Sequence, residues 1–198
     1  MLSLRSCQPI GQGAFRHCFI HPDDEYLCIK VSHGRRIGAP GYKDPNLREF
    51  AEYERLRTIG APVHRFGPKI HGFIETDLGP DLCVERLRGS GGGLVSNIRT
   101  VWQNRTKEGR SVDDILEGVR ELAAFCIEFR VLAACAAPEN IGVAQRGGRE
   151  QVVAFDFKGH SNKELIPLSN HIAYFCRRKI ERRFDRMIAD LVRARQQF

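Results

Sequence analysis

The feature that most constrains the fold of this chain is a glycine-rich stretch near its middle, Gly89-Ser90-Gly91-Gly92-Gly93. Such a stretch is typical of a connection between two structural parts, because glycine has little conformational preference. The residues before it alternate between strand and turn patterns, whereas helical patterns dominate after it. For a chain of 198 residues we therefore predict one α+β domain built from two lobes, residues 1–88 and 89–198.

The first lobe is predicted to contain a five-stranded antiparallel sheet and one helix. Short apolar or alternating runs bounded by turn residues predict strands at residues 7–10, 16–21, 26–31, 69–75 and 81–87. The pair Asp44-Pro45 predicts a helix after the third strand, because aspartate caps helix N-termini and proline suits the first turn. The expected buried stripe of this helix consists of Leu47, Phe50, Ala51 and either Tyr53 or Leu56.

The second lobe is predicted to be mainly helical. Ser111 caps a long amphipathic helix that extends to about residue 129. Two short strands, at 141–144 and 151–155, flank the turn Gly147-Gly148 and are expected to form a hairpin. A last helix is predicted to begin near residue 168 and to continue to the end of the chain.

A glycine-rich turn and a strand lysine suggest a phosphate site in the first lobe. Gly11 and Gly13 lie between two predicted strands, where glycine lets the backbone approach a phosphate and adopt positive φ angles. Lys30 follows in the apolar run Cys28-Ile29-Lys30-Val31, and a lysine is costly to bury in a strand unless it is paired. The alternative is a lysine on an edge strand, with its amine in solvent.

The predicted helix offers a carboxylate partner for Lys30. Glu49 shares a helix face with Tyr53 and Leu56, which are four and seven residues further along the chain. Glu52 is the alternative partner, and in an ordinary surface helix both carboxylates would face solvent. Either pairing would join the helix to the third strand.

Two oxygen-bearing side chains flank the predicted hairpin of the second lobe. Asn140 ends the segment Pro138-Glu139-Asn140, and Asp156 ends an apolar strand ahead of Phe157 and Gly159. A two-strand hairpin would bring Asn140 and Asp156 together. Amide and carboxylate oxygens are hard ligands that suit Mg²⁺ on a triphosphate.

The order of these features resembles the protein-kinase signature, from the glycine loop at Gly11 to the D-F-x-G segment that ends at Gly159. The chain also resembles the YrbL family of small bacterial proteins of the PhoP regulatory network. That similarity lies in H-P-x-D ahead of C-I-K, in R-E-x-x-x-Y, in G-F-I-E-T-D-x-G, and in L-I-P-L followed by an aromatic, Cys/Arg/Lys-rich helix. The resemblance implies a two-lobed kinase-like fold that binds ATP.

The kinase resemblance implies a nucleotide-binding role for several residues of the first lobe. Gly11 and Gly13 would cover the phosphates of ATP. Lys30 would bind the α- and β-phosphates, and Glu49 would orient it. The segment from Glu85 to Leu87, where the lobes join, would form the hinge that reads adenine.

The same resemblance implies a magnesium site in the second lobe. Asn140 and Asp156 would hold Mg²⁺, and together with Lys30 they would be the catalytic residues of a phosphotransferase. The cofactors implied are therefore ATP and Mg²⁺.

The chain departs from the kinase pattern at the catalytic base. Counting back from Asn140, the aspartate of H-R-D-x-x-x-x-N is Cys135, and the third glycine of the loop is Arg16. A missing base lowers the rate by roughly 10²–10⁴, so slow phosphotransfer and none at all are both consistent with the sequence. Cys135 itself is either a thiolate base or nucleophile, or a buried inert thiol.

Three functions are consistent with these features. The chain is a phosphotransferase with an unknown acceptor, or a pseudokinase that binds nucleotide and regulates a protein partner. The third is a binding module for RNA or another polyanion, because the net charge is +7 and residues 171–198 hold eight basic against three acidic residues. The plain alternative for this basic segment is a solvated helix face.

The remaining composition indicates a cytoplasmic protein with reduced cysteines. No apolar run approaches the roughly 18 residues of a membrane span, and the first residues lack the apolar segment of a signal peptide. The seven cysteines form no C-x-x-C pair and mostly lie in apolar runs, so we expect buried free thiols rather than a zinc site.

Overall fold

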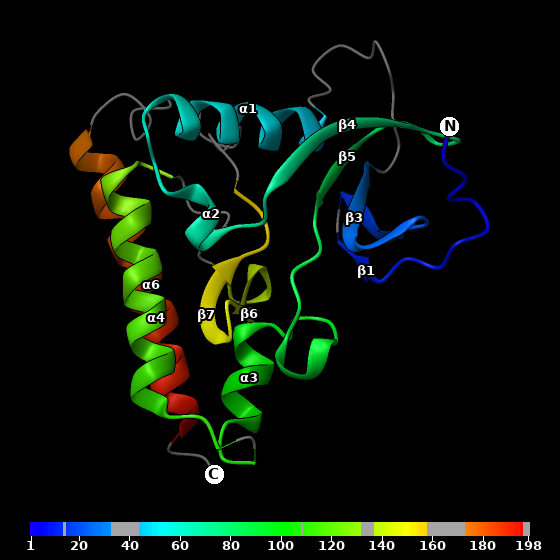
Figure 1. Cartoon of the computed structure of the whole chain (residues 1–198). Helices are drawn as coiled ribbons and strands as arrows, with labels where there is room; N and C mark the ends of the chain where they lie inside the picture. The colour runs from blue at the N-terminus through cyan, green and yellow to red at the C-terminus, as the bar shows by residue number, and fades with distance from the viewer. Residues whose placement is uncertain (14, 33–43, 108, 132–136, 158–172, 196–198) are drawn as a thin grey trace. The chain divides into compact units, whose positions relative to one another are not determined.

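The chain divides into two compact units in the computed structural model shown in Figure 1. Unit 1 comprises Met1–Ile59 and Pro68–Leu87, and unit 2 comprises Gly60–Gly67 and Arg88–Phe198. Unit 2 thus includes Gly60–Gly67, a segment that falls inside the predicted first lobe. The structure describes residues 1–13, 15–32, 44–107, 109–131, 137–157 and 173–195.

Unit 1 is built on a five-stranded antiparallel sheet with the strand order β1-β2-β3-β5-β4. The described part of this unit has one helix, α1 (Pro45–Thr58), which follows the third strand. The predicted five-stranded antiparallel sheet with one helix is therefore confirmed, although its first strand lies at Gly11–Gln12 instead of residues 7–10. The strands are β1 (Gly11–Gln12), β2 (Arg16–His21), β3 (Asp24–Ser32), β4 (Ile70–Thr76) and β5 (Gly79–Glu85).

The first strand differs from its prediction at residues 7–10. The Ile10 N–H donates to the Cys18 carbonyl over 2.8 Å, and the Gly13 N–H donates to the Arg16 carbonyl over 2.8 Å. Between these two bonds, Gly11 pairs with Cys18 in the antiparallel register. The glycine segment therefore pairs with β2 itself, instead of only connecting two strands.

Helix α1 begins as predicted but buries a different face. The carboxylate of Asp44 accepts a hydrogen bond from the Asn46 N–H over 2.8 Å and caps the helix. The predicted stripe is wrong in part, because Leu47 is 58% exposed. The buried residues of α1 are Asn46, Glu49, Glu52, Tyr53 and Leu56. Three of these five are polar, so this face is held by polar bonds as well as by apolar packing.

The N-terminal residues complete the core of unit 1. Leu4 is 1% exposed and packs with Phe19, Ile29 and Val31 on one face of the sheet. The carboxylate of Asp77 holds this segment, because it accepts the N–H of Leu4 over 2.8 Å. The opposite face of the sheet buries Cys28, Leu82 and Val84.

Unit 2 combines helices with a two-stranded hairpin. The predicted long helix and hairpin are confirmed, and Ser111 caps the helix by accepting the Asp114 N–H. Helix α3, which follows Asn97 as its cap and buries Trp102, was not predicted. The elements are α2 (Val63–Phe66), η1 (Ser90–Gly92), α3 (Ile98–Asn104), α4 (Val112–Glu128), η2 (Pro138–Asn140), β6 (Ile141–Arg146), β7 (Arg149–Ala154) and α6 (Ala173–Arg195).

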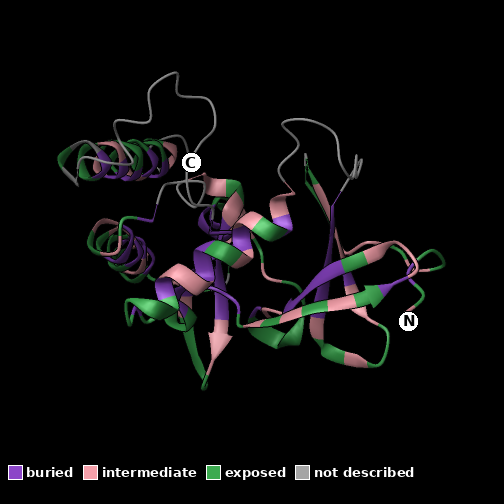
Figure 2. Ribbon diagram, turned by 90° about the horizontal axis from the view of Figure 1, so that it is seen from above, coloured by how far each residue is buried: buried purple, intermediate pink, exposed green. Residues whose placement is uncertain are grey.

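Helices α4 and α6 pack side by side in unit 2 through apolar faces (Figure 1). Figure 2 shows that each helix has a buried and an exposed side. Helix α4 buries Leu122 and Phe125 among other apolar residues, and α6 buries Ile180 and Phe184. None of the helices in the described ranges combines the length and apolar character that a bilayer span requires.

A glycine sets how closely α4 approaches the hairpin. A Cβ atom added to Gly118 would lie 2.5 Å from Cγ2 of Val152 on β7. No such contact is tolerated in a packed core, so the absence of a side chain at position 118 permits this distance between helix and strand.

Candidate functional site: a cation cluster in unit 1 and a hairpin in unit 2

Lys30 lies in the central strand of the unit 1 sheet. It pairs with Cys18 on β2 and with Leu82 on β5, and it is 9% exposed. Its Nζ donates to Oε1 of Glu49 over 2.7 Å. The alternative of an edge-strand lysine with its amine in solvent is therefore wrong.

Glu49 reaches Lys30 from helix α1 and is itself 0% exposed. Both of its carboxylate oxygens are used, because Oε2 accepts from Nη1 of Arg16 while Oε1 accepts from Lys30. Glu52, the alternative partner, pairs with Arg55 along the same helix, with 2.6 Å between Oε1 and Nη2. Of the two carboxylates considered, the structure brings Glu49 to the lysine.

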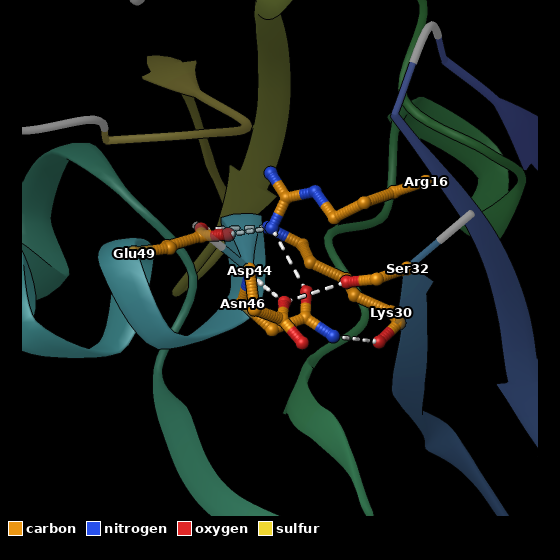
Figure 3. Close-up of polar contacts among 6 residues, drawn as sticks. All are labelled: Arg16, Lys30, Ser32, Asp44, Asn46 and Glu49. Atoms are coloured by element: carbon orange, nitrogen blue, oxygen red, sulfur yellow. Dashed lines mark hydrogen bonds and ion pairs between the residues drawn. The ribbon is translucent and has the colours of Figure 1, made fainter. Parts of the chain in front are cut away.

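Arg16 is the member of this cluster that the sequence did not predict. It occupies the position of the third glycine in the kinase loop, yet its guanidinium points to the same carboxylate as Lys30 (Figure 3). Nη1 of Arg16 also donates to Oδ1 of Asn46 over 3.2 Å. Arg16 and Glu49 are 33 positions apart, and such a contact leaves no periodic signal in the sequence. The sequence therefore shows Arg16 only as a departure from the kinase pattern.

A second layer of hydrogen bonds ties the start of α1 to β3. Nδ2 of Asn46 donates to the main-chain carbonyl of Lys30 over 2.6 Å. Oγ of Ser32 donates to Oδ1 of Asp44, the helix cap, over 2.7 Å (Figure 3). These bonds fix the helix relative to the strand and therefore fix Glu49 relative to Lys30.

The cluster of Arg16, Lys30 and Glu49 holds two cations and one carboxylate, so these three side chains sum to a charge of +1. The side chains of Arg16 and Lys30 are 12% and 11% exposed, while that of Glu49 is 0% exposed. A guanidinium and an ammonium group around one buried carboxylate place several N–H donors close together. The arrangement is thus suited to phosphate oxygens.

The two loop glycines flank this cluster in sequence but differ from expectation in backbone conformation. Neither Gly11 nor Gly13 is among the described glycines with positive φ, so neither uses the left-handed conformation that glycine permits. A Cβ atom at Gly11 would lie 3.7 Å from the Cβ of Cys18, which is ordinary contact. Residue Ala14 between the glycines and β2 lies outside the described residues.

The predicted hinge residues lie where the sheet of unit 1 ends and the chain leaves that unit. Glu85 ends β5, where Oε2 accepts the N–H of Lys69 over 2.9 Å and its own N–H donates to the Lys69 carbonyl. Leu87 is the last residue of unit 1 before the chain enters unit 2. The carboxylate of Glu85 is thus engaged at the start of β4.

Asn140 and Asp156 lie at the open end of the hairpin in unit 2. The Phe155 N–H donates to the main-chain carbonyl of Asn140 over 2.8 Å, and Ile141 pairs with Ala154. Asp156 follows β7 and is 7% exposed. The hairpin therefore brings the two predicted metal ligands to the same end.

The donor set at this end fits a magnesium ion that is shared with a nucleotide. An amide oxygen and a carboxylate are hard donors, and Mg²⁺ commonly takes one or two protein ligands plus phosphates and waters. The described residues contain no group of three or more His, Cys, Asp or Glu side chains that could hold a metal. A dedicated all-protein metal cage is thus not seen in the described part of the chain.

The basic segment of the sequence forms the outer side of α6. Arg178, Arg182 and Arg186 are exposed and follow one another at spacings of four residues. Arg177 pairs with Glu181 over 2.7 Å along the helix. Cys135, at the position of the kinase base, lies outside the described residues, as does Gly159.

Comparison with known proteins places the chain in a family. Residues 2–192 match the family described as PhoP regulatory network protein YrbL. The chain belongs to this family. Two curated relatives, each named uncharacterized protein YrbL, come from Escherichia coli strain K12 and Shigella flexneri. Each is 25% identical over 189 residues, which cover 96% of this chain and 87% of the relative.

A solved kinase domain is among the similar structures. The kinase domain of PknI from Mycobacterium tuberculosis matches with a TM-score of 0.47 and 16% sequence identity. The match covers 78% of this chain and 59% of the kinase domain.

Proposed function

We propose that this protein binds ATP with Mg²⁺ in the manner of a protein kinase. The observation that carries the proposal is the ion pair between Lys30 on β3 and Glu49 on α1, with 2.7 Å between Nζ and Oε1. In protein kinases a lysine on the third strand pairs with a glutamate on the following helix, and this pair must be in place for phosphotransfer. Buried ion pairs contribute little to net stability, which favours a binding role for this pair over a purely structural one.

The charge of the cluster supports a phosphate ligand. Arg16 and Lys30 share one carboxylate, so phosphate oxygens would find donors on both side chains. Lys30 would bind the α- and β-phosphates, and Arg16 would add a second cation at the position of the third loop glycine. Gly11 and Gly13 would cover the phosphates, and the hinge from Glu85 to Leu87 would contact adenine.

Mg²⁺ would be held by Asn140 and Asp156 at the end of the hairpin in unit 2. When bound, the ion would neutralise charge on the phosphates of the nucleotide. The carboxylate of Asp156 would supply the charged ligand, and the amide oxygen of Asn140 would supply a neutral one.

The proposed outcome of binding is regulation of a protein partner rather than rapid phosphotransfer. The aspartate of the kinase catalytic loop corresponds to Cys135, and loss of a general base lowers the rate by roughly 10²–10⁴. Nucleotide binding does not need that base, since the phosphate and metal ligands are other residues.

Titration of the purified chain with ATP and Mg²⁺, followed by thermal unfolding, tests the proposal. A ligand that binds only the folded state at 100 times its Kd adds about 2.7 kcal/mol of stability. Lys30→Met and Asp156→Ala should each remove most of this increase. Lys107→Met, which changes an exposed lysine of unit 2, is the matched control and should leave it unchanged.

The absence of any shift at millimolar nucleotide would reject ATP binding and with it both kinase interpretations. If Lys30→Met and Lys107→Met reduced the shift equally, binding would be nonspecific attraction to a protein of net charge +7.

A further inference from the structure

Two cysteines of unit 1 lie on one face of the sheet, beside the cation cluster. In the antiparallel register of β2 and β3, Cys18 is opposite Lys30, and Ile20 is opposite Cys28. Residues two apart on a strand share a face, so Cys18 and Cys28 are diagonal neighbours on the face that also carries Lys30.

The surroundings of the two sulfurs differ. The hydrogen bond from Cys28 lowers the pKa of the Cys18 thiol, and the charges of Lys30 and Arg16 lower it further, against the opposing effects of burial and Glu49. The pKa of Cys28 is raised by its hydrogen bond with Cys18 and by burial. Of the two thiols, Cys18 is therefore the one that loses its proton more readily.

Access to the two sulfurs also differs. Cys18 is half-buried, whereas Cys28 is 4% exposed. The residue opposite Cys18 on β1 is Gly11, and a Cβ there would lie 3.7 Å from the Cβ of Cys18. Because Gly11 has no side chain, the strand beside Cys18 does not cover it.

We propose that Cys18 and Cys28 form a thiol modification site that reacts with hydroperoxides, with Cys18 as the attacking sulfur and Cys28 as the resolving one. Redox-sensing cysteines are accessible thiolates that lie next to a second cysteine, and cations stabilise the thiolate. Among the described cysteines, Cys83, Cys126 and Cys176 are buried and Cys7 is half-buried. The site needs neither a metal nor a nucleotide.

The reaction balances with hydrogen peroxide as the two-electron oxidant. The Cys18 thiolate attacks one peroxide oxygen, so that an S–O bond forms, the O–O bond breaks and the leaving hydroxide takes up a proton as water. The Cys28 sulfur then attacks the sulfenic acid of Cys18. An S–S bond forms, the S–O bond breaks, and the leaving hydroxide takes the Cys28 proton as a second water.

The position of the pair makes the product reversible. Diagonal neighbours on antiparallel strands have Cα atoms about 7–8 Å apart, whereas disulfides prefer about 4.4–6.8 Å. Bond formation must therefore draw β2 and β3 out of register, and a strained disulfide is readily reduced by thiols. The same movement would displace Lys30, which is opposite Cys18, so oxidation would weaken nucleotide binding. Only this last consequence rests on the proposed function.

Peroxide treatment of the reduced full-length chain, followed by alkylation and peptide mass spectrometry, tests the site. We expect a Cys18–Cys28 linked peptide, and at least tenfold faster loss of the Cys18 thiol than of the Cys7 thiol. In Cys28→Ser the oxidation should stop at a sulfenic acid on Cys18, trapped by dimedone. Cys7→Ser is the matched control and should react like the wild type. Circular dichroism of each variant confirms that it is folded.

Equal reaction rates for Cys7 and Cys18 would overturn the proposal, as would a disulfide between any other pair. A folded Cys28→Ser protein that yields no dimedone adduct on Cys18 would also overturn it. Formation of the linked peptide with unchanged Mg-ATP affinity would support the thiol site and reject its coupling to nucleotide. Mass spectrometry detects the Cys18–Cys28 disulfide without ATP. The test of the thiol site is therefore independent of whether the protein binds nucleotide.

Discussion

Helices α1 of unit 1 and α4 of unit 2 begin alike but bury opposite kinds of side chain. Each has a side-chain cap, Asp44 for α1 and Ser111 for α4. The buried face of α4 is apolar, as its sequence pattern predicts, whereas that of α1 includes Asn46, Glu49 and Glu52. Helix α4 is held mainly by apolar packing, and α1 is held in part by bonds to Arg16 and Lys30.

The difference shows where this chain departs from an ordinary core. Burial of an apolar face stabilises the fold because apolar surface is removed from water. Burial of a carboxylate such as Glu49 costs hydration energy, which its hydrogen-bonding and charged partners must offset. The position of α1 against the sheet is therefore set in part by the electrostatic interactions of Glu49 with Arg16 and Lys30. The predictions that follow test whether α1 and α4 really differ in this way.

The largest expected effect is that of Glu49→Gln. Removing one partner of a buried ion pair destabilises a protein by about 3–5 kcal/mol, and here Arg16 and Lys30 both lose the carboxylate that they contact. The free energy of unfolding in urea, followed by circular dichroism, measures this loss. The matched control is Glu54→Gln on the same helix, whose pair with Arg57 has side chains 45% and 73% exposed, and it should cost about 0.5 kcal/mol or less. Equal losses in both variants would remove the distinction between the two faces of α1.

Leu122→Ala tests the apolar face of α4 in the same assay. Leu122 is 0% exposed, and truncating a buried leucine costs about 3 kcal/mol through lost burial and the cavity left behind. Its affinity for Mg-ATP, measured below the unfolding temperature, should match the wild type, whereas Glu49→Gln should lose affinity. An affinity loss in Leu122→Ala would show that the apolar packing of α4 also affects nucleotide binding.

Cys135→Asp tests whether the proposed nucleotide site can support phosphotransfer when a carboxylate stands at position 135. A positioned carboxylate is worth roughly 10²–10⁴ in rate, so an otherwise competent protein should gain about tenfold or more in ATP hydrolysis or phosphotransfer. Release of labelled phosphate measures the change, with Cys7→Asp as a control for nonspecific effects. A folded variant that binds ATP without gaining activity would favour the regulatory function. Activity in the wild type that is lost in Cys135→Ala would show that Cys135 itself takes part.

The smallest expected effect is on the outer side of α6, where Arg178, Arg182 and Arg186 are exposed. Replacing Arg178, Arg182 and Arg186 with Gln should change stability by roughly 0.5 kcal/mol or less per site, because these side chains are exposed. Like charges four residues apart repel slightly, so the sign could favour the variant. If the basic side binds RNA instead, the wild type will bind with steep salt dependence and the triple variant will not. Undetectable or salt-insensitive binding would exclude that function.

Elements with local signals could be predicted from the sequence. The Asp44-Pro45 and Ser111 caps, the Gly147-Gly148 turn and the apolar runs led to α1, α4, the hairpin and the central strands. Helix α3 was missed because it is short, although Asn97 is a capping residue whose side chain accepts the Thr100 N–H.

Contacts between distant residues could not be predicted from local patterns. Asp77 holds Leu4 across 73 positions, and Arg16 meets Glu49 across 33. The predicted buried stripe of α1 was wrong in part for the same reason, since Asn46 and Glu49 are bonded to Arg16 on β2 and Lys30 on β3. The lysine and its glutamate could be proposed because they follow the kinase order, but the added arginine could not.

Gly118 has a consequence for engineering a more stable variant. Exchange of a helix-interior glycine for alanine usually stabilises a protein by up to about 1 kcal/mol, which makes position 118 an obvious choice in a thermostabilisation screen. Here the new methyl group would meet Val152 at 2.5 Å, so Gly118→Ala alone should lower the melting temperature. A library that allows Val152→Ala at the same time should recover part of that loss. A screen that changes one position at a time would reject position 118, although most of the obstacle is one methyl group of Val152 on a neighbouring strand.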